Sequence, residues 1–353
     1  MKALLCGVLN GSTGDAPLLR EFEISCSDPA FYGEWKWLPS APAHAQFDIA
    51  NLRTLSLHHV PFKWSSPMLR NLRHLQLRSL PTVHIALDRI LYIVAGNPQL
   101  ESLSLYFASP NPPVLPLTPV TLSELKSLTL GGHYLLSNLI ESLMLPALDT
   151  LILDIDETRD PIEDTVASLL TRSGNPPVTR LSLSYGPPPG PHPGFYWGSG
   201  AGVASWRFLT ELDQLVTLQV GAAALEPLIS ALSAPDDDNG QDRWMCPALE
   251  ELAMRSCHAH GDGVAKLVQM VDARNPDQGG GGGGGLGIGG AGALGGAGTA
   301  FGGVVPVRLR QLELYDCTSL GPDVTKWLKT RVEEVMCTEP TFEGYVGRLV
   351  LVH

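Results

Sequence analysis

The stretch Leu52–Leu57, LRTLSL, decides the fold, because its three leucines have the spacing L-x-x-L-x-L and that spacing returns along the chain. Further strict copies begin at Leu72, Leu100, Leu125, Leu148 and Leu309. Relaxed copies with other apolar residues begin at Leu19, Val178, Leu215, Leu249 and Val332. About one residue in six is leucine, so roughly one or two strict triplets would arise by chance, and six at intervals of mostly 20 to 30 residues favour a repeat architecture.

Alternation within each triplet predicts a short strand. In x-L-x-L-x the two leucines point to one side of a strand and their neighbours point to the other side. Two or three buried leucines do not offset the entropy of ordering their segment, so each unit needs a neighbour on either side. The triplets therefore predict units that stack on one another.

Several segments between the triplets have helical spacing. The clearest covers residues 85–94 and closes at Gly96-Asn97-Pro98, where Gly and Pro stop a helix. Residues 162–170 and 264–271 repeat this design and also run into an Asn-Pro pair. The link between the first two strict triplets is only about 20 residues long, which predicts a loop or a single helical turn.

Together these patterns predict an α/β leucine-rich-repeat solenoid, with a curved parallel sheet on the concave side and helices and loops on the convex side. We expect one irregular domain over residues 1–353, of about ten units. Two segments interrupt the pattern: a Pro/aromatic loop at residues 186–197 and a Gly-rich insertion at residues 279–303. The composition of the second segment predicts disorder.

The motif Asn-Pro-x-Leu-Glu-x-Leu-x-Leu at Asn97–Leu105, with related copies beginning at Leu249 and Leu309, resembles the leucine-rich-repeat region of fungal (basidiomycete-type) F-box proteins. The resemblance implies a substrate-recognition subunit of a Skp-cullin ubiquitin ligase, whose F-box docks on a Skp-type adaptor. No stretch of this sequence matches the F-box motif. The nearest, at Leu38-Pro39, lacks the acidic residue that follows Leu-Pro in that motif. We therefore expect a truncated gene product or a member that has lost its F-box, with the adaptor as partner only if an F-box precedes Met1. The alternative is a free-standing scaffold or regulatory protein.

Bulk properties restrict the partners. A formal net charge of -12 argues against nucleic acid, because phosphate binding needs clustered Lys and Arg. No apolar run is long enough to span a membrane, and the weak N-terminal signal pattern favours a cytoplasmic or nuclear protein. The six cysteines form no C-x-x-C pair, and we interpret them as reduced, buried packing residues.

Candidate chemistry is weak at every position considered. Cys257, His258, His260 and Asp262 could bind a metal, but Cys257 already has a place in the repeat. The glycine spacing that begins at Gly287, within the glycine tract, matches the G-x-G-x-x-G motif of dinucleotide-binding proteins. That motif requires a preceding strand and a following helix, and the sequence predicts neither here. The sequence therefore predicts no enzyme, no cofactor and no metal site.

The partner surface is predicted from the residues that flank the strand leucines, because these line the concave face. Tyr106, Arg78 and Tyr315 are the strongest candidates, since Tyr and Arg are enriched among residues that dominate binding energy. The full set of candidate partner-binding residues is His58, His74, Arg78, Tyr106, Asp154, Arg180, Arg255, Glu313 and Tyr315. We expect a protein substrate on this face.

Overall fold

The computed structural model describes most of the chain, which divides into two compact units, Met1–Val178 and Thr179–His353. The described residues are 18–25, 51–60, 64–156, 162–186, 205–221, 223, 225–235, 243–257, 262–277, 304–315, 317 and 320–338. The predicted Pro/aromatic loop beyond Gly186 and the Gly-rich insertion lie outside them, as do His258 and His260. The expectation of a single continuous domain stays a prediction.

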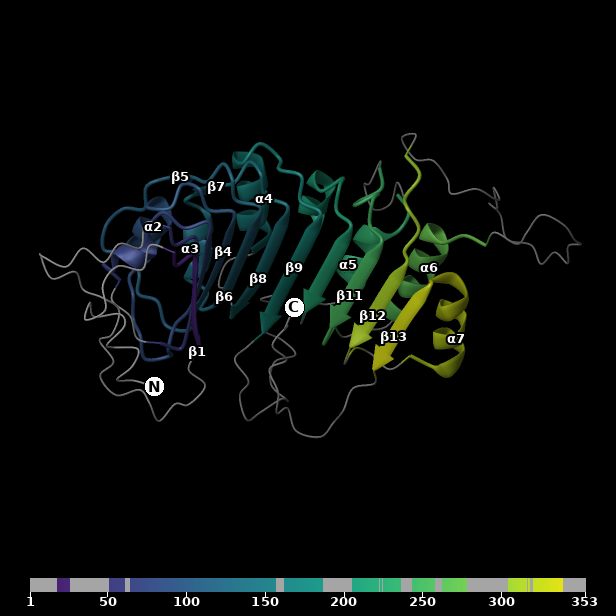
Figure 1. Ribbon diagram of the computed structural model, residues 1–353. Coiled ribbons are helices and arrows are strands. Elements are labelled where there is room, and N and C mark those ends of the chain that lie inside the picture. The colour runs from purple at the N-terminus through teal and green to yellow at the C-terminus, as the bar shows by residue number, and fades with distance from the viewer. Residues whose placement is uncertain are drawn as a thin grey trace, which may run out of the picture. The chain divides into compact units, whose positions relative to one another are not determined.

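The main sheet of the first unit is parallel, and its strands follow one another in chain order (Figure 1). Each strand begins two residues after the first apolar residue of a predicted triplet. The described strands are β1 (Glu21–Ser25), β2 (Thr54–His58), β3 (His74–Arg78), β4 (Ser102–Phe107), β6 (Ser127–Gly132) and β8 (Thr150–Asp156). A separate parallel pair, β5 (Val120–Thr121) and β7 (Leu143–Met144), was not predicted.

The register of this sheet places equivalent triplet positions opposite one another. Leu55 pairs with Leu75, Leu75 with Leu103, and the alignment continues through Leu128 and Leu151. All five side chains are no more than 2% exposed. Burying a leucine contributes about 1.5–3 kcal/mol, and a slip of one residue would turn every leucine to the other face. The leucines therefore fix both the pairing and the buried side.

The second unit has the same arrangement. Its described strands are β9 (Arg180–Gly186), β10 (Thr217–Gly221), β11 (Glu251–Arg255), β12 (Gln311–Tyr315) and β13 (Glu334–Thr338), parallel and in chain order. Leu181 pairs with Leu218, Leu218 with Leu252, and Leu252 with Leu312. The faint triplet at Val332 is thus a strand as predicted.

Helices occupy the connections where the sequence predicted them. The segment at residues 85–94 forms α2 (Leu87–Ala95), which ends at Gly96, and the two similar segments form α4 (Ile162–Arg172) and α6 (Gly263–Arg274). The short first link contains one 3-10 turn, η2 (Pro67–Leu69), as predicted. Further elements are α3 (Leu136–Ile140), η3 (Arg207–Glu211), α5 (Leu225–Leu232) and α7 (Pro322–Arg331). Within each unit the helices contact one another in chain order, so a helical layer accompanies the strands.

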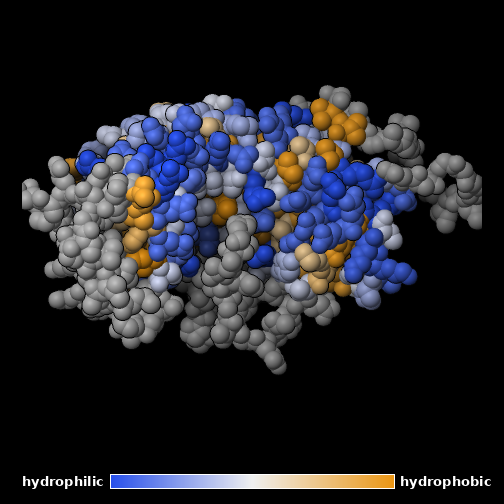
Figure 2. All heavy atoms as spheres, in the orientation of Figure 1, coloured by the Kyte–Doolittle hydropathy of each residue, from blue (hydrophilic) through white to orange (hydrophobic). Residues whose placement is uncertain are grey.

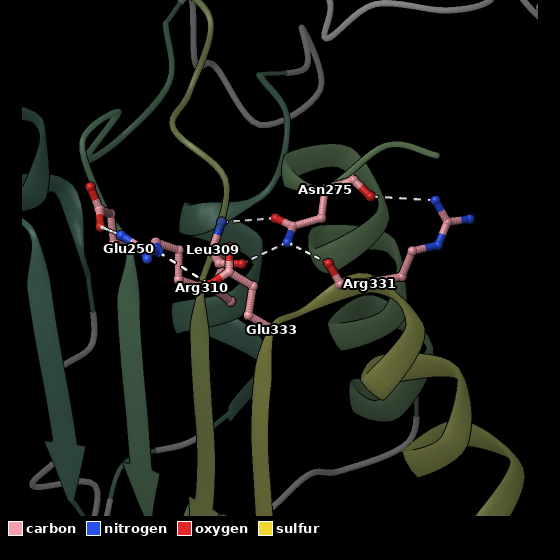
Figure 3. Close-up of polar contacts among 6 residues, drawn as sticks. All are labelled: Glu250, Asn275, Leu309, Arg310, Arg331 and Glu333. Atoms are coloured by element: carbon pink, nitrogen blue, oxygen red, sulfur yellow. Dashed lines mark hydrogen bonds and ion pairs between the residues drawn. The ribbon is translucent and has the colours of Figure 1, made fainter. Parts of the chain in front are cut away.

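Asn97 and Asn275 are buried, and each links the end of its own helix, α2 or α6, to neighbouring turns. The Oδ1 atom of Asn97 accepts from the Leu72 N–H at 2.8 Å, and its Nδ2 donates to the Leu69 and Ile93 carbonyls. Asn275 accepts from the Leu309 N–H at 2.9 Å and donates to the carbonyls of Leu309 and Arg331 at 2.7 and 2.9 Å (Figure 3). Because these backbone groups are buried, they would otherwise lack partners.

Arginines end three of the helices and donate to backbone carbonyls of earlier residues. Arg274 is 1% exposed, and its guanidinium donates to the carbonyls of Leu232, Met245 and Cys246 at 2.6–3.3 Å. Burial lowers the pKa of Arg274 to about 10. Arg172 donates likewise to the carbonyls of Ile140 and Leu143, and Arg331 donates to that of Asn275. The helix ends are thereby tied to preceding parts of the chain.

Charges alternate at the position after the first apolar residue of several triplets. Arg73 forms an ion pair with Glu101 at 2.8 Å in the first unit. In the second unit Arg310 lies between Glu250 and Glu333, 3.4 Å from each (Figure 3). Exposed pairs contribute little stability, but they join strands that neighbour one another.

Of the four cysteines among the described residues, three are buried packing residues, as predicted, and one is not. Cys246, Cys257 and Cys317 are free and buried, and burial raises the pKa of Cys246 to about 12. The Cys257 and Cys317 thiols donate to the Val220 and Met254 carbonyls of the preceding strand at 3.7 and 3.4 Å. For Cys337 the prediction of burial is wrong: it is exposed. Its strand, β13, pairs on one side only among the described residues.

Candidate functional site

The strand registers arrange the face residues of each sheet in rows. The third face position of each strand in the first unit defines the Arg78 row: Ser25, His58, Arg78, Tyr106, Gly131 and Asp154. The corresponding Arg255 row of the second unit is Ser184, Gly221, Arg255, Tyr315 and Thr338. Six of the nine predicted partner-binding residues lie in these two rows.

In the Arg78 row, the register brings a cation and an aromatic ring together. The Arg78 guanidinium carbon lies 4.5 Å from the centre of the Tyr106 ring, within the range of a cation–π interaction. Tyr106 in turn lies over Gly131, because a Cβ at that glycine would come within 2.5 Å of the Tyr106 Cδ2 atom. A strand glycine thus makes room for the ring.

The same arrangement occurs in the Arg255 row. The Arg255 guanidinium carbon lies 5.0 Å from the centre of the Tyr315 ring. Here the pair has acidic neighbours: burial, together with the nearby Glu313 carboxylate, raises the pKa of Tyr315. The Glu313 carboxylate itself accepts a hydrogen bond from Gln311 at 2.6 Å.

The remaining predicted residues lie around or away from these pairs. His58 lies beside Arg78 in the register and is half-buried. His74, Asp154 and Arg180 are exposed, at register positions away from the two Arg–Tyr contacts. Sequence reasoning missed Gly131 and Gly221, although an isolated glycine inside a strand pattern is a signal of close approach.

Among the described residues there is neither a candidate metal site nor a candidate membrane-spanning helix. Among them no group of three or more His, Cys, Asp or Glu side chains is placed to hold a metal ion. In the same residues no helix has both the length and the apolar character for a membrane span. Figure 2 shows a largely hydrophilic visible surface, with an apolar cluster at the loop before β12, where Val304, Val305 and Val307 are 42–58% exposed.

Comparisons with protein-family models, with curated proteins and with solved structures found no match for this chain. The two rows of face residues are therefore the basis for assigning a function.

Proposed function

We propose that this chain is a protein-binding leucine-rich-repeat solenoid whose strand faces hold a protein partner. One observation carries the proposal: equivalent leucines pair across neighbouring parallel strands and are buried. The residues between them lie on the opposite face, where they are half-buried or exposed. Such a face presents side chains on a rigid support without using them in the core.

The residues on this face suit protein binding better than catalysis. Tyr and Arg are enriched among residues that dominate interface energies, and both rows contain an Arg–Tyr contact. The stacking orients each guanidinium before a partner arrives, so less side-chain entropy is lost on binding. We therefore propose a binding role without enzymatic activity.

A photo-crosslinking experiment tests the binding face. The crosslinker p-benzoylphenylalanine is placed at Ser104, at the middle face position of β4, and in a control protein at Arg89, an exposed residue of α2. The proposal expects one partner to be crosslinked from Ser104 and not from Arg89. With that partner purified, Tyr106→Ala should weaken binding by about tenfold or more. Crosslinking from Arg89 alone, or unchanged affinity of Tyr106→Ala, would contradict the proposal.

The ubiquitin-ligase role is the finer part of the proposal, and the Asn97–Leu105 motif supports it only through resemblance. Its test is co-purification of a Skp-type adaptor with the native full-length product. Retention of the adaptor supports a substrate-recognition subunit of the F-box type. Clean absence, with a complete N-terminus verified, supports the free-standing scaffold instead.

A further inference from the structure

The two Arg–Tyr pairs have the same geometry but different electrostatic surroundings. Both arginines occupy the last face position of a strand, and both stack on a tyrosine of the next strand, at 4.5 and 5.0 Å. The two pairs therefore differ in the residues around them, His58 and Gly131 in one row and Gly221 and Thr338 in the other, and in the neighbouring charges. This makes the Arg255 pair an internal control for the Arg78 pair.

Around Arg78 the flanking strands carry no carboxylate on this face, and the acidic face residues of β1, Glu21 and Glu23, lie two strands away. The face positions of β2, β3, β4 and β6 are Thr54, Ser56, His58, His74, Gln76, Arg78, Ser102, Ser104, Tyr106, Ser127, Thr129 and Gly131. None of these is acidic. The row's own carboxylate, Asp154, lies three strands from Arg78, about 14 Å at the usual strand spacing. That distance exceeds the screening length of about 8–10 Å in physiological salt.

Two nitrogens in this row also lack hydrogen-bond partners. The His58 Nε2 and Arg78 Nε atoms are buried and have no partner. Within the part of the chain that the structure describes, no ion pair includes Arg78. Buried polar groups are normally hydrogen-bonded, and one without a partner costs about 1–3 kcal/mol. An oxyanion can accept from the Arg78 guanidinium, and from His58 Nε2 when that nitrogen carries the proton.

Around Arg255 the situation is reversed. Glu251 lies on the same strand and face, and Glu313 lies one face position before Tyr315. Glu313 is close enough to Tyr315 to raise its pKa. These carboxylates offset the positive charge of Arg255, so an anionic ligand gains less binding free energy at this row than at the Arg78 row.

We propose that the Arg78 row binds an acidic segment of the protein partner, with an anionic side chain placed at the Arg78 guanidinium between His58 and Tyr106. The inference rests on the proposed binding function and specifies the chemistry of the partner. The shared chemistry is an oxyanion, from an aspartate, a glutamate or a phosphorylated side chain. Because the whole chain has a formal charge of -12, general attraction of polyanions does not account for such binding.

Fluorescence anisotropy of two labelled peptides tests this site on the full chain. One peptide is octaglutamate, and the other contains phosphoserine among serine and glycine. The variants are Arg78→Gln and, as the matched control, Arg255→Gln. We expect Arg78→Gln to weaken binding by roughly tenfold or more and Arg255→Gln to change it by less than about twofold. The peptide that binds more tightly identifies the source of the oxyanion.

The results separate this inference from the proposed function. Equal effects of the two substitutions, or no binding of either peptide to a chain shown to be folded by circular dichroism, would overturn the acidic-segment proposal. A partner crosslinked from Ser104 would leave the proposed function standing in that case, with a partner of different chemistry. If Arg78→Gln unfolds the chain, Arg78→Met provides the test, because it keeps the aliphatic stem, removes the charge and should weaken octaglutamate binding by a similar factor.

Discussion

Gly131→Ala should show a strong energetic coupling to Tyr106. A Cβ at this position would come within 2.5 and 2.9 Å of the Tyr106 Cδ2 and Cε2 atoms, so the ring must leave Arg78. Losing the cation–π contact costs about 0.5–1 kcal/mol, and an off-rotamer tyrosine costs about 0.5–1.5 kcal/mol. Replacing a strand glycine by alanine returns about 0.5–1 kcal/mol. The net effect is destabilisation of roughly 0–2 kcal/mol by these magnitudes.

In a Tyr106→Ala background the clash is absent and only the backbone gain remains. Gly131→Ala should then stabilise the chain by about 0.5–1 kcal/mol, which reverses the sign of the substitution. The coupling energy between the two positions is expected to be about 1–2.5 kcal/mol.

Urea unfolding of the wild type, both single variants and the double variant measures this coupling, provided that the m-value is unchanged. Gly96→Ala is the control, because a Cβ there meets no atom of Tyr106 and its effect should add to that of Tyr106→Ala. Additivity of Gly131→Ala and Tyr106→Ala within about 0.5 kcal/mol would refute the packing of the ring over the glycine.

Two further predictions concern buried polar groups. Asn275→Ala leaves the Leu309 N–H and two carbonyls without their partner, and we expect a loss of about 2–5 kcal/mol by urea unfolding. Asn275→Asp should be no better, because a carboxylate would face those carbonyls; wild-type stability of either variant would contradict the assigned contacts. Cys246 has a pKa raised by burial from 9.0 to about 12, so its stabilising contribution is full below pH 9 and is lost as the pH rises toward 12. Cys246→Ala should therefore show a smaller loss of stability between pH 9 and pH 12 than the wild type, and equal slopes would contradict this.

The strands could be predicted from the sequence because their cause is local. Leu55 and Leu57 alternate with polar residues, and equivalent positions on neighbouring strands must pair if all of them are to be buried. The same alignment puts Arg78 and Tyr106 at equivalent positions of neighbouring strands, so the sequence predicts that both lie on the same face. The helices α2 and α6 could also be predicted, since Asn97-Pro98 and Asn275-Pro276 follow them.

Other features depend on spatial neighbours that spacing does not reveal. An arginine at the end of a helix, such as Arg274, normally suggests a solvated cation, and its burial results from three carbonyls distant in sequence. The different surroundings of Arg78 and Arg255 follow from residues on adjacent strands. Cys337 occupies a triplet position, but the position of its strand in the sheet leaves it exposed.

Because of the Asn275 side chain, the sequence between Asn275 and Leu309 can be lengthened without separating these two residues. The Asn275 side chain forms hydrogen bonds of 2.7 and 2.9 Å with the backbone of Leu309. These bonds hold together the residues on either side of the long intervening segment. Each doubling of a flexible loop adds only about 0.6 kcal/mol of closure cost. Added residues between Asn275 and Leu309 should therefore cost folding little, and this part of the sequence is where a reporter domain is best inserted.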